Sequence, residues 1–140
     1  MIVLVLDPGH TTGWAVLTEE KIVATGIFPF YRDVKMLIEQ YKPDKAVLED
    51  FTLYPWKSHA LAWSQLQTVQ TLGVMKYLLA DESGIPYELQ TASLVKSLSK
   101  RLIGTYHSQH ERDSVTHGLV YLQRQGLLSK NLRRLLWRRE

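Results

Sequence analysis

The sequence predicts an α/β protein built on a five-stranded mixed sheet with helices on both faces. Three observations support this fold class. Segments with the patterns of strands and helices follow one another in the order three strands, helix, strand, helix, strand, helix. Some strand candidates are nearly continuous apolar runs, which is typical of strands buried on both faces. The 140 residues are enough for one domain with a core but too few for two of ordinary size.

The first three strands are predicted at residues 2–7, 12–18 and 21–27. The first run is apolar up to a final aspartate, which is followed by a Pro-Gly turn. The segment "TEEK", residues 18–21, fits the turn of a hairpin between the second and third strands. The sheet is therefore expected to begin with neighbouring strands close together in the sequence.

A helix is predicted over residues 32–41 and a fourth strand over residues 45–50. The helix prediction depends on apolar residues at i, i+3, i+4 and i+7, which form one stripe: Val34, Leu37, Ile38 and Tyr41. Lys42-Pro43 ends this helix. The strand "KAVLED" reads as buried and, like the first, finishes in a carboxylate.

The second half of the chain alternates loops, helices and one strand. Residues 51–58 form an aromatic-rich loop, and a long helical pattern runs from about 59 to 81. A short fifth strand is predicted at residues 86–90. Thr91 can cap a short helix that runs to about residue 99.

The last long helix has the clearest start signal in the sequence. "SQHE" is a capping box, in which the Ser108 hydroxyl bonds a free backbone amide and Glu111 reaches back. This helix is expected to run to about Gln125, with Gly126 ending it. A short basic helix should follow.

Composition narrows the class of protein. The net charge of +3 gives weak support for a polyanionic partner, but five basic residues lie in the last eleven positions: Lys130, Arg133, Arg134, Arg138 and Arg139. That cluster fits either a local positive field or a solvated helix face. The chain has no cysteine, which excludes disulfides, thiolate zinc sites and cysteine nucleophiles. The apolar start is too short to span a bilayer, so a cytoplasmic protein without membrane contact is expected.

Two carboxylates are predicted to meet at one edge of the sheet. Asp7 ends the first strand and Glu49 lies at the end of the fourth. If one crossover helix joins these strands, they are parallel and adjacent, and ligand sites in such sheets lie beyond the carboxyl ends of the strands. Two acids placed there repel each other unless a cation lies between them.

The last long helix supplies two more candidates. His110 and Asp113 are three residues apart, so they share a helical face and can point at one centre. Three carboxylates and one imidazole suit Mg²⁺ or Mn²⁺. Each residue also has a plainer interpretation as a turn, strand-end or solvent-facing residue. His117, one turn beyond Asp113, is expected to be exposed or packed and is not assigned to the metal.

Four segments together resemble the motifs of a known family. "LDPGHTTGWAV" looks like the first-strand motif of the RuvC family of Holliday junction resolvases, "VLEDF" like its fourth-strand motif, and "HERDSVTHGLVYL" like its last helix. "GIPYELQTASLVKSL" is similar to the family's fifth strand and the helix that follows. The resemblance covers residues 2–122. It implies a ribonuclease H-like fold with strand order 3-2-1-4-5 and a single nuclease domain over residues 1–140.

The resemblance also implies an activity and its site. The activity is that of a structure-selective, metal-dependent endonuclease that cuts four-way DNA junctions and leaves 5′-phosphate and 3′-hydroxyl ends. The matching motifs imply two Mg²⁺ or Mn²⁺ ions per site, with Asp7 bridging them, Glu49 on one ion, and His110 and Asp113 on the other. A histidine ligand should favour Mn²⁺, because imidazole is softer than carboxylate.

DNA contacts and a twofold dimer follow from the same resemblance. The expected DNA-binding residues are Phe51, Trp56, Lys57, Lys96, Lys100 and Arg101, with Tyr54 and the C-terminal basic cluster. The three aromatic residues equally fit core or lid positions. A homodimer is expected because symmetric cutting of two strands needs two sites. The helix at 59–81 has two apolar stripes, one of which can face the sheet and the other a second subunit: Leu61, Leu72, Met75 and Leu79, and Leu66, Val69 and Gly73.

Three alternatives remain open at the level of sequence. The chain can be another metal-dependent nuclease of the same fold, acting on other branched DNA or on RNA–DNA hybrids. It can be a non-catalytic module that binds junctions. "DPGHTTGW" also resembles the phosphate-binding turn of actin-like kinases, but those need a second lobe, so no nucleotide cofactor is expected. A compact chain of this type fits a phage or mobile element, acting at the nucleoid or in the host cytoplasm.

Overall fold

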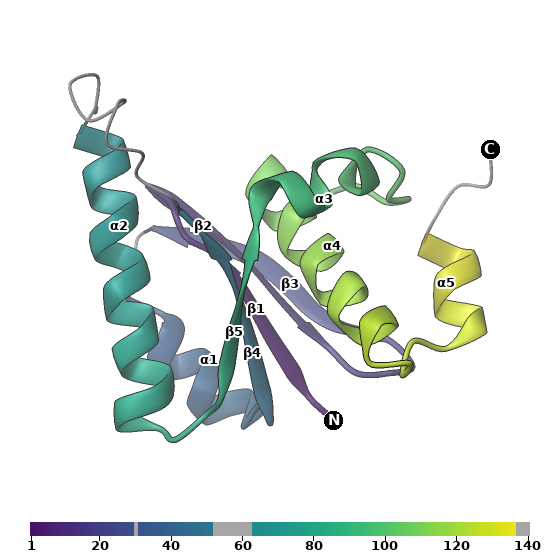
Figure 1. The fold of residues 1–140 in the computed structure, drawn as a ribbon, viewed down its shortest axis with the longest axis horizontal. Helices are drawn as coiled ribbons and strands as arrows, with labels where there is room; N and C mark the ends of the chain where they lie inside the picture. The colour runs from purple at the N-terminus through teal and green to yellow at the C-terminus, as the bar shows by residue number, and fades with distance from the viewer. Residues whose placement is uncertain (30, 52–62, 137–140) are drawn as a thin grey trace.

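A computed structural model describes residues 1–29, 31–51 and 63–136 (Figure 1). The strands are β1 (Val3–Asp7), β2 (Thr11–Leu17), β3 (Ile22–Pro29), β4 (Lys45–Asp50) and β5 (Tyr87–Thr91). The helices are α1 (Val34–Tyr41), α2 (Trp63–Lys76), α3 (Ala92–Ser99), α4 (Gln109–Arg124) and α5 (Lys130–Leu136), and α2 continues into a π-helical segment (Tyr77–Glu82). The predicted elements are thus present in the described part of the chain.

The five strands form one mixed sheet in the order β3-β2-β1-β4-β5. Strand β2 pairs antiparallel with β1 and with β3, whereas β4 pairs parallel with β1 and with β5. Parallel neighbours need a crossover, and α1 and α2 supply the two that are required. The predicted fold class and strand order are confirmed.

Helices cover both faces of the sheet, as Figure 1 shows. Alternate residues of β1 point to opposite faces, so Leu4 and Leu6 belong to one core and Val3 and Val5 to the other. The first core lies under α1 and α2, and the second under α4 and α5. The central strand is buried on both faces because each side of it contacts a helical layer.

The position of α2 decides between its two apolar stripes. Leu72, Met75 and Leu79 are buried in the core of this chain, so they face the sheet. Of the two stripes of this predicted dimer helix, the one with these residues is not available for a contact with a second subunit, because the sheet already covers it. Leu66 and Val69 are half-buried and Gly73 is exposed. Leu61 lies outside the described residues.

Helix α4 begins and ends at the residues that its signals indicate. The Ser108 hydroxyl accepts a hydrogen bond from the backbone amide of Glu111 at 3.2 Å. Gly126, just beyond the helix, has φ +71°, a left-handed conformation that glycine adopts without strain. Thr91 is the N-cap of α3 as predicted, but its hydroxyl pairs with that of Ser93 and makes no cap hydrogen bond.

Among the helices in the described ranges, none combines the length and apolarity needed to cross a bilayer.

Candidate metal centre

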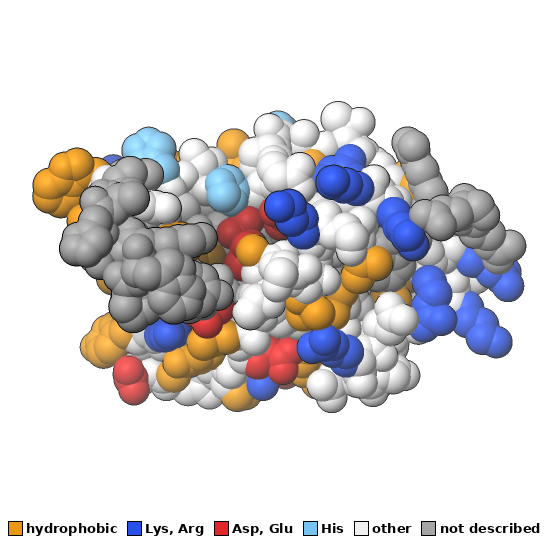
Figure 2. All heavy atoms as spheres, turned by 45° about the horizontal axis from the view of Figure 1, so that its top comes forward, with side chains coloured by type: hydrophobic (Ala, Val, Ile, Leu, Met, Phe, Trp, Pro, Cys, Tyr) orange, Lys and Arg blue, Asp and Glu red, His pale blue; other side chains and the backbone are white. Residues whose placement is uncertain are grey.

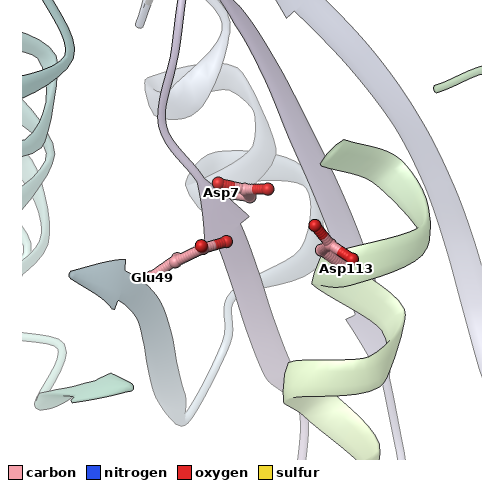
Figure 3. Close-up of side chains that lie close together, drawn as sticks. All are labelled: Asp7, Glu49 and Asp113. Atoms are coloured by element: carbon pink, nitrogen blue, oxygen red, sulfur yellow. The ribbon is translucent and has the colours of Figure 1, made fainter. Parts of the chain in front are cut away.

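Three carboxylates converge at the edge of the sheet. The parallel register that pairs Leu6 with Leu48 brings the end of β1 beside the end of β4, and Asp113 approaches from α4. One oxygen from each of Asp7, Glu49 and Asp113 lies within 4.8 Å of the others. Figure 3 shows the three side chains pointing toward one another. Residues more than a hundred positions apart in the sequence therefore share one site.

The backbone at Gly13 allows α4 to come this close. Gly13 is the register partner of Asp7 on the neighbouring strand. A Cβ atom at Gly13 would collide with the backbone of His110 and Glu111 in the first turn of α4. The helix therefore rests directly on the main chain of β2, beside the end of β1. This contact holds the start of α4 at the height of Asp7.

Asp7 and Glu49 lie in an environment that disfavours two negative charges. Burial raises the pKa of Asp7 well above its usual value and the neighbouring Glu49 raises it further, although the hydrogen bond with His110 acts in the opposite direction. Burial also acts to raise the pKa of Glu49, but the adjacent His117 ring and Asp7 outweigh it and lower that pKa. Burial and the neighbouring Glu49 both favour the neutral form of the Asp7 carboxyl, which reduces the repulsion between the two groups.

His110 contacts Asp7 directly. Its Nδ1 lies 2.9 Å from Asp7 Oδ2, and its side chain is 46% exposed. This hydrogen bond raises the pKa of His110 against the opposing effect of its partial burial. His110 and Asp113 lie one turn apart on α4, and His110 reaches the site through its contact with Asp7. The group of mutually close ligand atoms in the described residues consists of the three carboxylates, and His110 flanks it through Asp7.

Two neutral donors orient Asp113. Ser99 Oγ and Gln109 Nε2 each donate to Asp113 Oδ1 at 2.7 Å, and Gln109 Nε2 also donates to Ser99 Oγ at 3.1 Å. Both bonds to the carboxylate end on the same oxygen. Among the described residues, this leaves Asp113 Oδ2 available as a ligand atom.

His117 is a site residue whose contact the sequence did not reveal. Its side chain is fully buried, with Nε2 3.3 Å from Glu49 Oε2 and Nδ1 2.7 Å from Gln90 Oε1. The expectation that it is either exposed or packed resolves to packed, against a carboxylate of the site. The available signal was its place in α4, one helical turn beyond Asp113 on the same face.

A cavity of about 350 Å³ opens beside Asp113. It is lined by Ala92, Lys96, Lys100, Gln109 and Asp113. The predicted phosphate contacts Lys96 and Lys100 therefore border the carboxylate cluster. Figure 2 shows acidic side chains in a hollow on this face, with histidine side chains beside them and basic side chains along one flank.

The loop between α3 and α4 is held by one arginine. Arg112 donates to the backbone carbonyls of Ser99 and Leu102 at 2.8 Å and of Gly104 at 3.2 Å, and its guanidinium lies over the ring of Tyr106. This loop carries Arg101, whose side chain is exposed. Arg101 directly follows Lys100, which lines the cavity, so the anchored loop holds Arg101 close to that cavity.

Several predicted DNA contacts lie elsewhere. Phe51 is half-buried just after β4, and the C-terminal basic residues that the structure describes are exposed on α5: Lys130, Arg133 and Arg134. Other residues of that prediction lie outside the described ranges: Tyr54, Trp56, Lys57, Arg138 and Arg139. For these the sequence prediction stands alone.

The donor set fits a divalent cation of the hard type. Carboxylate oxygens are the ligands that Mg²⁺ and Mn²⁺ prefer, and three of them meet here. Among the described residues, Glu49 Oε2 is buried without a hydrogen-bond partner, which is costly unless another group satisfies it. A cation at the cluster would balance the charges of the three carboxylates.

Solved structures of junction resolvases share this fold. Thermus thermophilus RuvC in complex with Holliday junction substrate is 16% identical, with a TM-score of 0.65 over 91% of this chain and 98% of that chain. A second Thermus thermophilus RuvC structure is 15% identical, with a TM-score of 0.60 over the same shares. The yeast mitochondrial Holliday junction resolvase Ydc2 is 11% identical, with a TM-score of 0.59 over 95% of this chain and 82% of that chain.

No known protein family and no curated protein matches this chain at the level of sequence. At identities of 11–16% the likeness shows a common fold. The chain therefore shares the fold of the RuvC structures, a five-stranded mixed sheet in the strand order 3-2-1-4-5, as its motifs predicted.

Proposed function

We propose that this chain is a metal-dependent endonuclease that resolves four-way DNA junctions, with residues 1–140 as one nuclease domain in the cytoplasm. The observation that carries the proposal is the convergence of Asp7, Glu49 and Asp113 within 4.8 Å. Those carboxylates lie on a fold shared with RuvC and Ydc2, both of which are junction resolvases. The pattern of an acidic centre with basic side chains beside it suits a polyanionic substrate.

The cavity beside Asp113 gives the substrate a place to bind. Lys96 and Lys100 line it and can neutralise phosphates of the cut strand, while Asp113 forms its edge toward the acidic cluster. A DNA strand held there would present a phosphodiester to the carboxylates. We assign the exposed basic residues of α5 to phosphates farther from the cut.

Asp7, Glu49 and Asp113 would hold two Mg²⁺ or Mn²⁺ ions, with His110 as an additional ligand. The chemistry that such ions supply is activation of a water molecule and stabilisation of the leaving 3′ oxygen, which gives 5′-phosphate and 3′-hydroxyl ends. Asp7 would bind a metal as the carboxylate, and burial, which raises its pKa, opposes that charged form. His110 holds the Asp7 carboxylate in place through Nδ1.

Cutting both strands of a junction requires two such sites, so we propose a homodimer. On α2 the stripe formed by Leu66, Val69 and Gly73 lies outside the core clusters of the described residues, and a Cβ at Gly73 would meet open space. Trp63, on the same helix, is 81% exposed. This side of α2 is the proposed dimer face.

A cleavage panel tests the proposed function. The full chain is incubated with a four-way junction, a flap, a linear duplex and an RNA–DNA hybrid, each with Mg²⁺, Mn²⁺ or EDTA. We expect metal-dependent, paired cuts in the junction above the other substrates. Equal cutting of all DNA substrates would indicate a different nuclease of this fold, and junction binding without cleavage in any metal would indicate a non-catalytic module.

A further inference from the structure

His117 lies beneath the carboxylate cluster rather than beside it. It is in the third turn of α4, one turn beyond Asp113, and its side chain has no exposed surface. From there its Nε2 reaches to 3.3 Å from Glu49 Oε2. The ring therefore links α4, which carries Asp113, to β4, which carries Glu49.

Gln90 fixes the orientation of this ring. The Gln90 Nε2 amide donates to Glu88 Oε1 at 3.2 Å, which turns Gln90 Oε1 toward His117 Nδ1 at 2.7 Å. A carbonyl oxygen only accepts, so Nδ1 carries a hydrogen and donates it. Gln90 is itself 3% exposed and lies opposite Glu49 in the pairing of β4 with β5. The imidazole is thus locked with Nε2 facing Glu49.

The contact between His117 and Glu49 contributes little to the stability of the fold. Among the described residues, Glu49 Oε2 and His117 Nε2 are buried atoms that make no aligned hydrogen bond. Leaving such atoms unsatisfied costs free energy. The neighbouring inward residues Val115 and Leu119 are apolar and fully buried, so an apolar side chain at position 117 would match this layer. The presence of the polar pair His117 and Glu49 at this position instead indicates a role in the carboxylate cluster above it.

We propose that His117 is a positioning residue for the metal centre: held by Gln90, its ring fixes the Glu49 carboxylate in the orientation that faces Asp7 and Asp113. This inference rests on the proposed function, because it assumes that the three carboxylates bind a divalent cation. The inference adds a fully buried residue of α4 to the residues that serve the proposed function. Partners that orient a metal-binding carboxylate typically affect metal affinity as strongly as some ligands do.

Two conservative substitutions separate positioning from packing. In His117→Gln the side-chain amide reaches the place of Nε2 and can donate to Glu49 through its NH₂ group, as the ring does when both of its nitrogens carry hydrogen. In His117→Asn the shorter amide reaches only the place of Nδ1 and so keeps the contact with Gln90 but loses Glu49. His107→Gln is the matched control, because His107 is on the approach to the same helix with a side chain that is 77% exposed.

Mn²⁺ binding to variants of the 140-residue chain, measured by titration calorimetry without DNA, is the direct readout. We expect His117→Asn to weaken Mn²⁺ binding by about 10–100-fold, and His117→Gln to recover most of that loss. His107→Gln should bind Mn²⁺ as the unsubstituted chain does. Equal losses in the Gln and Asn variants, or no loss in folded His117→Asn, would overturn the positioning role.

A second measurement needs no substitution and covers the case in which the His117 variants do not fold. In the chain labelled with ¹⁵N-histidine, Mg²⁺ is added and the imidazole resonances are followed by NMR. We expect the His117 resonances to shift as the metal site fills, and those of His107 to stay in place. Unchanged His117 resonances at saturating Mg²⁺ would overturn the proposal.

Asp7→Asn distinguishes failure of this inference from failure of the proposed function. If Asp7→Asn removes Mn²⁺ binding while His117→Asn leaves it intact, the metal centre stands and His117 has no positioning role. If Asp7→Asn binds Mn²⁺ as tightly as the unsubstituted chain, the carboxylate cluster is not the metal centre, and both proposals fail together.

Discussion

The two faces of the sheet differ in the kind of side chain that they bury. The face under α1 and α2 is covered by a core of apolar side chains, in which Leu72, Met75 and Leu79 are nearly or fully buried. The face under α4 also buries polar and charged groups, among them Glu111, Ser114, Thr116 and His117. The face under α1 and α2 contributes mainly to stability. The face under α4 also buries polar groups that hold the site in place, and burying them lowers stability.

The polar groups on the α4 side are satisfied mainly within the layer itself. Ser114 and Thr116 hydroxyls donate to backbone carbonyls one turn earlier, at 2.9 and 3.0 Å. Glu111 accepts from Thr25 on β3 at 3.2 Å and lies 2.8 Å from His107 Nδ1. Farther along α4, Leu119 and Leu122 return to apolar packing. The helix is therefore polar where it passes the site and apolar beyond it.

This contrast is tested most strongly at Asp7. We expect Asp7→Asn to reduce junction cleavage by about 10²–10³-fold or more, since a ligand charge at the reacting centre is lost. Junction binding should change little, because the lysines and arginines that contact phosphates remain. Cleavage on labelled junctions and binding in EDTA measure the two effects. Cleavage that survives in Asp7→Asn would show that the acidic cluster is not the reacting centre.

The opposite face should affect stability alone. Leu79→Ala removes a fully buried side chain from the α2 core and should lower the free energy of unfolding by about 2–5 kcal/mol. Urea unfolding in EDTA measures this change. The Mn²⁺ affinity of the folded variant should be unchanged, because α2 contributes nothing to the carboxylate cluster. A large loss of Mn²⁺ affinity would contradict the division between the two faces.

Ser99 offers a smaller test on the site face. Ser99→Ala removes a donor to Asp113 Oδ1 and should lower Mn²⁺ affinity by about tenfold, while unfolding free energy changes by about 1 kcal/mol. Ser93→Ala on the same helix is the control, because its hydroxyl contacts only Thr91 among the partners described here. The prediction is wrong if both serine variants affect Mn²⁺ binding equally.

The smallest expected effect is a pH-dependent gain in stability. The pKa of Asp7 is raised in the folded chain by burial, so the folded state binds this proton more tightly than the unfolded state does. The stability that the proton contributes is present below the unfolded pKa and is lost as pH rises through the folded pKa. Metal-free Asp7→Asn should therefore become more stable than the unsubstituted chain as pH rises.

Thermal unfolding in EDTA across a series of pH values measures this difference. The gap in Tm between the two proteins should widen with pH and then level off above the folded pKa of Asp7. A gap that is constant with pH would indicate that Asp7 keeps its ordinary titration in the folded chain. The same substitution is thus expected to stop cleavage and to stabilise the fold.

The strand ends and one helix start carried most of the prediction from sequence. Asp7 and Glu49 end strands that one crossover makes parallel, and the capping box at Ser108 fixed where Asp113 falls on its helix. Topology alone then brings these side chains to one edge. The resemblance of the motifs added the strand order, which the structure confirms.

Contacts between elements were beyond the reach of sequence patterns. Two apolar stripes on one helix look alike until the sheet is in place, so the stripe with Leu72 and Met75 was not identified as the inner one. A histidine on an inward helical face has the same pattern whether it packs on leucine or on a carboxylate. The role of His117 depends on how deep α4 lies against β4, and no local signal encodes that depth.

The contact at Gly13 has a consequence for engineering this scaffold. Because main chain meets main chain there, the spacing between Asp7 and Asp113 is set by a rigid stop and not by adaptable side chains. The core under α1 and α2 can then be redesigned for higher thermal stability without changing the distance between Asp7 and Asp113. A larger distance between Asp7 and Asp113, by contrast, would demand a new backbone for the second strand.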